Sequence, residues 1–335
     1  MSVAEADYAL FTVYGKDVAA VVIFTIGFIG VCGNITIAWF TRKLPTMNNP
    51  FGRLLASQAS GEAILCTCFT FYVAPMMFFD SAFMIKYSYN AGWINLICYD
   101  ICTWSHLFIS INRFVAICMP MRYDTVFSNK NTGIMIGFMW IAAVVWETNV
   151  HYIADCLFIF EAPHWAFLFE TFKPVCAQIT WYSDFTRDIS FVFLIGIIDV
   201  VTIFQVHRLN KSSVGISQAQ IARRKREVNF LKQAILQMLV FVAELCTYFI
   251  LCKSFIDQRW IFWLMTSVAW VCVHTTDSLI ILSFNREFRR LVTTPLRKLC
   301  SVVGKDSTLI FASGTSPGLN SVPVHSLQEN SQTNY

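Results

Sequence analysis

The sequence predicts an all-α integral membrane protein built as a bundle of seven transmembrane helices. Seven long apolar runs, a low share of charged residues and unevenly charged connecting loops predict this fold class. Of the 335 residues, 56% are hydrophobic and 14% are charged, whereas a soluble domain carries about 25% charge. At a rise of about 1.5 Å per residue, about 20 apolar residues cross a bilayer core of roughly 30 Å. Such runs must be helical, because lipid offers no water to the backbone.

The apolar runs follow one another with polar segments between them. They cover residues 18–40, 54–79, 93–119, 133–154, 189–206, 234–251 and 260–284. Residues 1–17 are expected to form an extracellular N-terminus, and they lack the basic region and separate apolar core of a signal peptide. The helical domain is expected to cover residues 18–293. Residues 294–335 are rich in Ser, Thr, Gly and Asn, which predicts a disordered cytoplasmic tail.

The distribution of Lys and Arg over the loops predicts how the bundle is oriented in a cell membrane. Only six of the 25 Lys and Arg residues fall in the N-terminus and the alternate loops: Lys16, Lys86, Lys173, Arg187, Lys253 and Arg259. Basic loops stay in the cytoplasm, which predicts a multi-pass protein with its N-terminus outside and its C-terminus inside. The basic run at residues 223–226 lies between two membrane helices. We therefore expect the lipid bilayer, and no nucleic acid, as a partner.

Most of the 12 cysteines lie in or near the apolar runs, where they act as small apolar residues. Three others lie outside the runs and suggest specific chemistry. Cys156 and Cys176 lie in the long loop after the fourth run, on the oxidising outer side, which predicts a disulfide. Two free or otherwise paired thiols are the alternative.

Residues 285–292 are predicted to form a short amphipathic helix on the inner membrane surface, ended by Pro295. Cys300 is then either palmitoylated or an ordinary thiol.

A short motif marks the cytoplasmic end of the third run. Asn112, Arg113 and Phe114 stand where rhodopsin-like G-protein-coupled receptors usually have Asp or Glu, Arg and Tyr, and we interpret the motif as resembling theirs. Asp277 and Ser278 in the seventh run similarly resemble the start of that family's Asn-Pro-x-x-Tyr motif. The seven-helix fold is accordingly predicted to be rhodopsin-like.

A more specific resemblance is to the serpentine receptor class X (Srx) chemoreceptors of nematodes. Four sequence blocks carry the resemblance: residues 51–54 (FGRL), 56–63 (ASQASGEA), 105–114 (SHLFISINRF) and 285–288 (NREF). The loop that contains Cys156 and Cys176 adds to it. The resemblance implies a chemosensory receptor, located in sensory neuron cilia, that binds an external small molecule or peptide and activates a heterotrimeric G protein. Arrestin or a kinase acting on the tail would be a further partner.

Other function classes have weaker support in the sequence. A multi-pass transporter or a ligand-gated channel is the alternative function, and would favour internal repeats, broken helices or rows of polar residues along a pore. The sequence shows none of these. An enzyme would need metal ligands or a nucleophile at a recognised spacing, so we predict no enzymatic activity, no cofactor and no metal site. A membrane scaffold without signalling activity is a further alternative.

Ionisable residues inside the apolar runs are functional candidates, because burying a charge in a membrane is costly. Gln58 and Glu62 lie four residues apart, and His274 and Asp277 three apart, so each pair shares a helix face. Rhodopsin-like receptors use an acid on helix two to anchor sodium and water. Here Gln58 takes that place and Asp277 supplies an acid on helix seven, which predicts an exchanged polar network. Neutral hydrogen-bonded carboxyls without an ion are the alternative.

The resemblance also suggests a resting-state partner for Arg113. Glu227 lies below helix six at the spacing that the receptor pattern expects, so we predict an ion pair between the two side chains. A solvated Glu227 neutralised by the adjacent Arg226 is the alternative. Helices five to seven contain no proline. Any outward swing of helix six would therefore have to pivot without a proline kink.

The ligand pocket is predicted near the outer helix ends. Tyr99, Asp100 and Trp104 are the candidate lining residues, with Asp100 available to pair with an amine ligand. Aromatic residues at such positions also serve as packing or as membrane-interface belts. The sequence places no Lys or Arg deep in any helix. The acids in the bundle are therefore expected to lack basic partners.

Overall fold

The structure, a computed structural model, describes residues 3–211 and 218–291. The chain divides into a unit of residues 1–288, which contains the helix bundle, and a second unit of residues 289–335. Of the second unit, only residues 289–291 are described, and they are helical. The predicted tail at 294–335 and Cys300 lie outside the described residues.

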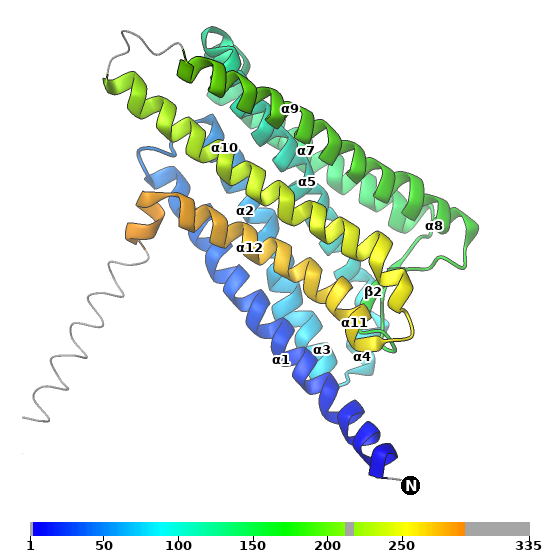
Figure 1. Ribbon diagram of the computed structural model, residues 1–335. Coiled ribbons are helices and arrows are strands. Elements are labelled where there is room, and N and C mark those ends of the chain that lie inside the picture. The colour runs from blue at the N-terminus through cyan, green and yellow to red at the C-terminus, as the bar shows by residue number, and fades with distance from the viewer. Residues whose placement is uncertain (1–2, 212–217, 292–335) are drawn as a thin grey trace, which may run out of the picture. The chain divides into compact units, whose positions relative to one another are not determined.

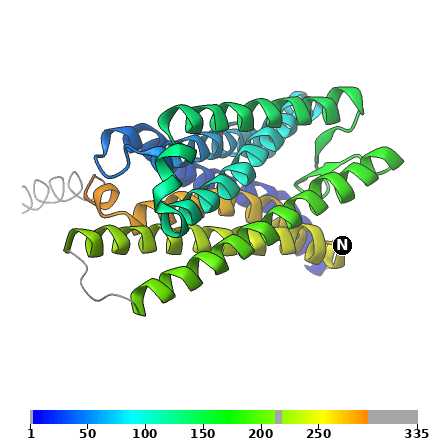
Figure 2. The same ribbon diagram turned by 90° about the horizontal axis from the view of Figure 1, so that it is seen from above.

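Seven segments of the first unit are long and apolar enough to cross a membrane. They are Gly15–Lys43, Pro50–Phe78, Ser88–Cys118, Asn129–Ile153, Pro174–Leu209, Arg224–Phe255 and Arg259–Phe284. The long helices lie side by side, and successive helices run in opposite directions (Figure 1 and Figure 2). The predicted seven-helix fold class is confirmed. We call the two ends of the bundle the Arg113 end and the hairpin end, after Arg113 and a β-hairpin at the opposite end.

Most spans combine several helical elements. The first four spans lie within α1 (Val3–Phe40) and η1 (Thr41–Lys43); α2 (Pro50–Cys68), η2 (Phe69–Val73) and α3 (Ala74–Phe78); α5 (Ser88–Cys118); and α7 (Asn129–Thr148) and η4 (Asn149–Ile153). The last three lie within α8 (Pro174–Gln178), η5 (Ile179–Phe185) and α9 (Thr186–Lys211); α10 (Gln218–Leu245), η6 (Cys246–Leu251) and η7 (Cys252–Phe255); and α11 (Arg259–Trp263), η8 (Leu264–Val268) and α12 (Ala269–Phe284). Three short helices connect them: α4 (Ala82–Lys86), η3 (Pro120–Arg122) and α6 (Tyr123–Val126).

Local signals explain where several helices begin. Asn49 caps α2, because its side-chain oxygen accepts a hydrogen bond from the backbone nitrogen of Gly52 at 3.1 Å. Pro50 follows at the first helical position, where its missing N–H costs nothing. Pro174 opens α8 in the same way, so the fifth span starts well before the predicted residue 189. This earlier start places Arg187 inside a helix.

Turns of π-helix interrupt five of the seven spans. They are η2, η4, η5, η6 and η8, and all lie in the half of their span nearer the hairpin end. A π-helical turn widens the backbone and bends a helix, and such turns are frequent at functional sites. The sixth and seventh spans therefore have irregular segments that can bend without proline.

A β-hairpin that the sequence analysis did not predict lies at one end of the bundle. Strands β1 (Phe158–Glu161) and β2 (Ala166–Phe169) are antiparallel, with Phe158 opposite Phe169. The hairpin packs so closely on α5 that a Cβ added at Gly92 would lie 2.0 Å from the carbonyl oxygen of Phe158. Glycine is therefore required at this position.

Side chains of the bundle and the neighbouring core residues fix the hairpin at this end. The hydroxyl of Tyr248 donates to the carbonyl of Phe167 at 3.1 Å, and the hydroxyl of Ser267 donates to the carbonyl of Trp165 at 2.8 Å. The apolar core at this end includes Phe69, Phe158 and Trp270. The hairpin thus forms a packed cover over the end of the bundle.

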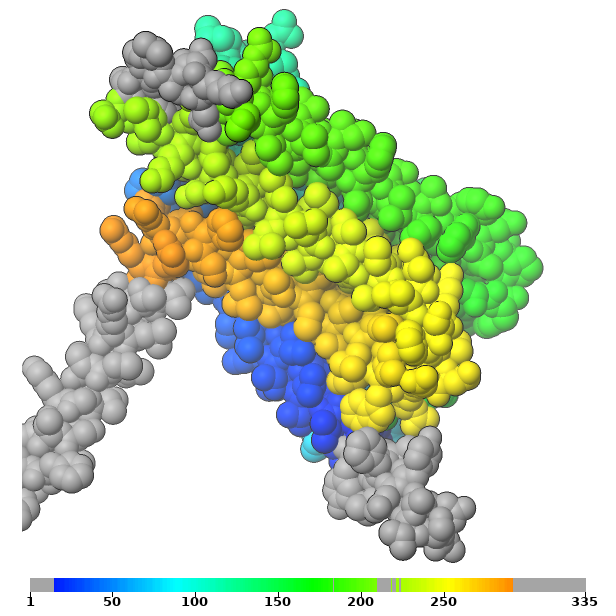
Figure 3. Space-filling view, in the orientation of Figure 1, coloured from blue at the N-terminus to red at the C-terminus, as the bar shows by residue number. Residues whose placement is uncertain are grey.

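The other end has its own apolar core. It includes Phe51, Phe127, Phe230 and Phe288, all of them buried. Phe288 follows α12, where Asn285 Oδ1 accepts hydrogen bonds from the backbone nitrogens of Glu287 and Phe288. On the face drawn in Figure 3, α12 lies between α1 and α10 and packs against both. Buried polar residues lie at mid-bundle and form part of the candidate site.

Candidate functional site

The side chain of Arg113 connects two helices at the Arg113 end. It is 2% exposed and forms an ion pair with Glu227 of α10. It also donates a hydrogen bond to the side-chain oxygen of Asn112. Its guanidinium lies over the ring of Phe51, 4.0 Å from the centroid, and 5.4 Å from that of Phe230. The structure therefore brings the predicted pair together and covers it with aromatic rings from α2 and α10.

The surroundings of this ion pair show why Arg113 needs a partner. A buried guanidinium is costly unless it is paired, and Glu227 supplies the opposite charge while its own side chain is 17% exposed. The side-chain amide of Asn112 also donates to the hydroxyl of Tyr123 at 3.2 Å. Phe114 is half-buried against the apolar core at this end. Separation of α5 from α10 would break the pair and open this end of the bundle.

A second polar group lies at mid-bundle and joins α2, α5 and α12. The side-chain nitrogen of Gln58 lies 2.9 Å from Glu62 Oε1 and 3.1 Å from Asp277 Oδ2, and can donate to both. His106 Nε2 lies 3.1 Å from the same Asp277 oxygen. All four side chains are buried. The structure thus brings Gln58, Glu62 and Asp277 together and adds His106, which the predicted network did not include.

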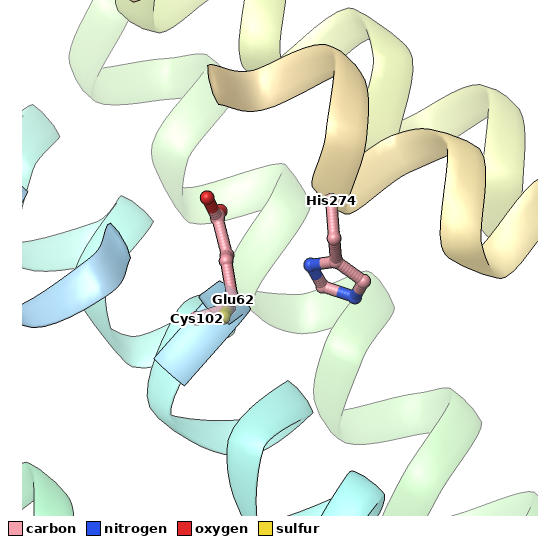
Figure 4. A group of neighbouring side chains, drawn as sticks. All are labelled: Glu62, Cys102 and His274. Carbon is pink, nitrogen blue, oxygen red and sulfur yellow. The ribbon is translucent and has the colours of Figure 1, made fainter. Parts of the chain in front are cut away.

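His274, expected on the same helix face as Asp277, does not hydrogen-bond to the polar group through its ring. Neither of its ring nitrogens has a hydrogen-bond partner among the described residues, although the side chain is buried. It lies beside Glu62 and Cys102 (Figure 4), and one potential ligand atom from each of the three lies within 4.8 Å of the others. Glu62, His106 and Asp277 form a second such group. Both groups combine a carboxylate with a histidine, which are side chains that can bind Zn²⁺, and all of these side chains are buried.

The expectation that the acids in the bundle lack a basic partner is wrong. Arg187, in α9, donates to both carboxylate oxygens of Asp100, at 3.1 and 2.5 Å. Its guanidinium also contacts Asp184 at 3.5 Å, Asp188 at 3.3 Å and Glu147 at 4.0 Å. The early start of the fifth span explains the error, because it moves Arg187 from the predicted loop into the bundle. Asp100 already has a cationic partner and does not need an amine ligand.

The three candidate pocket residues do not line one pocket. Tyr99 faces the bundle interior, where its ring centroid is 6.1 Å from those of Trp270 and His274. Asp100 and Trp104 instead line a crevice of about 320 Å³ with Arg187. Consecutive residues of a helix point about 100° apart, so Tyr99 and Asp100 cannot face the same space.

A small cavity lies beneath the hairpin. Its volume is about 20 Å³, room for roughly one water molecule. It is lined by Leu96, Tyr99, Phe158, Asp184, Glu244, Tyr248, Phe249 and Trp270. One carboxylate oxygen of Glu244 has no hydrogen-bond partner among the described residues. Aromatic rings and two carboxyl groups therefore surround a small space that borders the hairpin and two π-helical segments.

A disulfide joins the loop before the hairpin to the fifth span. The structure bonds Cys156 to Cys176, 20 residues apart, and both side chains are buried. Next to it, Lys173 Nζ contacts carboxylate oxygens of Asp155 at 2.8 Å and Glu170 at 2.9 Å. Hydrogen bonds to these two carboxylates raise the pKa of Lys173. The hairpin segment is thus connected to the fifth span by a covalent bond and by ion pairs.

Sequence reasoning missed two features of this site. Arg187 could have been found from Pro174, a residue typical of a first helical turn, with Asp184 and Asp188 close to the arginine on the same helix. The covering hairpin had weaker signals, because each strand has only four residues.

The chain has the fold of the rhodopsin-like seven-transmembrane receptors. Squid rhodopsin superposes with a TM-score of 0.70 over 85% of this chain and 86% of its own, at 15% sequence identity. Receptors of this class are membrane proteins that cross the bilayer several times, and they are not enzymes.

The chain belongs to the family described as serpentine type 7TM GPCR chemoreceptor Srx, which matches residues 24–285. Serpentine receptor class X 45 of Caenorhabditis elegans is 33% identical over 306 residues, covering 84% of this chain and 82% of that protein. Serpentine receptor class X-43 of the same organism is 25% identical over 276 residues, 79% of this chain and 85% of that protein. The predicted Srx resemblance is confirmed.

Proposed function

We propose that this receptor binds an external small molecule or peptide at the hairpin end and activates a heterotrimeric G protein at the Arg113 end. The observation that carries the proposal is the buried ion pair between Arg113 and Glu227, which joins α5 to α10. In this orientation the N-terminus is extracellular and the Arg113 end is cytoplasmic, as the basic loops favour. The proposed location is in sensory neuron cilia, as the predicted resemblance to Srx chemoreceptors implies.

The ion pair holds the resting state in this proposal. Once it breaks, α10 moves away from α5 and exposes a cleft for a helix of the G protein, an ordinary two-state switch. The π-helical segment η6, at the other end of the sixth span, provides a place where that span can bend. Arg113 then becomes available to the partner. Arrestin or a kinase would act on the tail beyond the described residues.

The ligand acts on the aromatic layer beneath the hairpin. Tyr99 contacts the ring of Phe241 on α10, with centroids 5.7 Å apart, and Phe241 also contacts His106 of the polar network. A ligand that displaces Tyr99 would therefore shift both the sixth span and the group around Gln58 and Asp277. This chain of contacts supports coupling between the two ends, which mutation has to demonstrate.

A ligand screen with G-protein activation as readout tests the proposal. Cells that express the wild type should respond to at least one compound, and the Arg113→Ala variant should lose the response at equal surface expression. Arg122→Ala, an exposed arginine at the same end, is the matched control and should respond like the wild type. A ligand-dependent current that persists without any G protein would contradict the proposal and favour a channel.

A further inference from the structure

A crevice of about 490 Å³ lies at the Arg113 end, on a side of the bundle away from the ion pair. Its walls come from α1 with η1 and from α7, and its floor from α2, which packs against both neighbouring helices. The lining residues are Ala38, Trp39, Arg42, Lys43, Arg53, Ala56, Ser57, Ser60, Ile136 and Trp140. The space exists because α2 presents only small side chains, Ala56, Ser57 and Ser60, along its floor.

The charged side chains that line the crevice are all positive. Arg42, Lys43 and Arg53 are its charged lining residues, and no carboxylate of the part of the chain that the structure describes lines it. None of the three forms an ion pair within the described ranges 3–211 and 218–291. Arg53 donates one hydrogen bond, to the backbone carbonyl of Asn129 at 3.1 Å, which leaves other N–H groups of its guanidinium for a ligand. An anion would find three cations in one place.

The cations lie at the depth of lipid headgroups. Arg42 and Lys43 end the first span, and Arg53 lies in the first turn of the second span. Ser60 lies about two turns further into the second span, roughly 10 Å deeper. The crevice therefore has a charged mouth near the membrane surface and continues inward beside the bilayer core.

The deeper part of the crevice suits an acyl chain. The Ser57 oxygen accepts a hydrogen bond from Trp140 Nε1 at 2.9 Å, and the Ser60 hydroxyl donates to the Ala56 carbonyl at 2.7 Å, so neither serine needs a polar ligand. Trp39 lines the crevice from α1 with 65% of its surface exposed, and Ile136 and Trp140 line it from α7. In a membrane protein the exposed Trp39 side chain faces lipid.

We infer that the crevice between α1, α2 and α7 binds one anionic phospholipid. Its headgroup phosphates lie against Arg42, Lys43 and Arg53, since guanidinium groups bind phosphate in bidentate fashion and basic pockets between membrane helices bind anionic headgroups. One acyl chain lies over Ala56 and Ser60 on the floor. A free phosphate compound would use the three cations but leave the apolar floor unfilled. The site does not depend on G-protein coupling.

Bound lipid would act on the helix that supports the ion pair. α2 carries Phe51, whose ring lies against the Arg113 guanidinium, and Gln58 of the polar network. The lipid would fix α2 between α1 and α7 from the side opposite these contacts. We therefore expect anionic lipid to raise the thermal stability of the folded receptor.

Native mass spectrometry of the purified full-length receptor tests the site, with phosphatidylinositol 4,5-bisphosphate as probe and phosphatidylcholine as the neutral comparison. The variant R42Q/K43Q/R53Q should bind the probe about 100-fold more weakly, given the usual contribution of each basic residue at an anionic surface. The matched control R122Q/R208Q/K225Q removes three cations from the same end, away from the crevice, and should bind like the wild type.

A second variant separates the crevice from simple surface charge. S60L keeps every cation but fills the floor, and should weaken binding at least tenfold while the thermal unfolding of the lipid-free receptor stays unchanged. Wild-type binding by R42Q/K43Q/R53Q or by S60L would overturn the inference. Equal binding of phosphatidylcholine, or equally tight binding of soluble inositol 1,4,5-trisphosphate, would overturn it as well, because the site would then recognise any lipid or any phosphate anion.

Discussion

Replacing Glu227 by glutamine should raise the basal activity of the receptor. The substitution keeps the size of the side chain and removes the charge that pairs with Arg113. A hydrogen bond between charged groups contributes about 1.5–3 kcal/mol. We take about 2 kcal/mol, since Arg113 is nearly fully buried and Glu227 is only 17% exposed.

This energy predicts the size of the effect. If about 1% of the wild-type receptor is active without ligand, a loss of about 2 kcal/mol from the resting state multiplies the active-to-resting ratio by about 30. About a fifth of the Glu227→Gln receptor would then be active, so basal signalling should rise roughly 20-fold. A rise of twofold or less would show that the pair contributes little to the resting state.

The assay is basal G-protein activation in cells, normalised to surface expression. Glu287→Gln is a suitable control, because Glu287 lies at the same end and accepts a hydrogen bond from Thr46, away from Arg113. It should leave basal activity unchanged. If Glu227→Gln behaves like the wild type at equal surface expression, the ion pair does not hold the resting state, and Glu227 acts as a solvated carboxylate neutralised by Arg226.

Three further substitutions test other parts of the structure. Gly92→Ala should destabilise the purified receptor in thermal unfolding by about 2 kcal/mol, because the new Cβ meets the hairpin backbone. Gly137→Ala is the control: it has open space around it and should stabilise the receptor by up to about 1 kcal/mol. Stability changes of the same sign in the two variants would contradict this prediction. Cys156→Ser should lower the stability by about 3 kcal/mol through loss of the bond to Cys176, and unchanged unfolding with and without reductant would count against it. Asp277→Ala should alter signalling at normal surface expression, and wild-type signalling would remove the polar network from the mechanism.

Hydrophobic length made the spans predictable from sequence. A run of about 20 apolar residues has few stable alternatives to a membrane helix, so the seven spans follow from composition alone. The ends of the spans do not follow from hydrophobicity, because polar residues such as Arg187 and Asp188 continue the fifth helix once a neighbouring helix supplies partners for them. The position of Arg187 in the bundle depends on Asp100, a residue 87 positions away in the sequence.

The spacing of residues within a helix predicted only part of the candidate site. It placed Gln58 and Glu62 on one face, and the receptor pattern suggested Glu227 as the partner of Arg113. It could not show that His106 rather than His274 bonds to Asp277, since that choice depends on how three helices rotate against one another. The five π-helical segments likewise have no local sequence signal comparable to proline.

Nucleotide release from a purified heterotrimeric G protein, measured with the purified receptor in lipid nanodiscs, tests whether the receptor signals through the Arg113 end. Glu227→Gln should accelerate nucleotide release, and adding Arg113→Ala to the same chain should abolish the acceleration. If neither the single variant nor the wild type accelerates release from any of a panel of G proteins, while the helical content of both is intact, the claim that this receptor signals through the Arg113 end is contradicted.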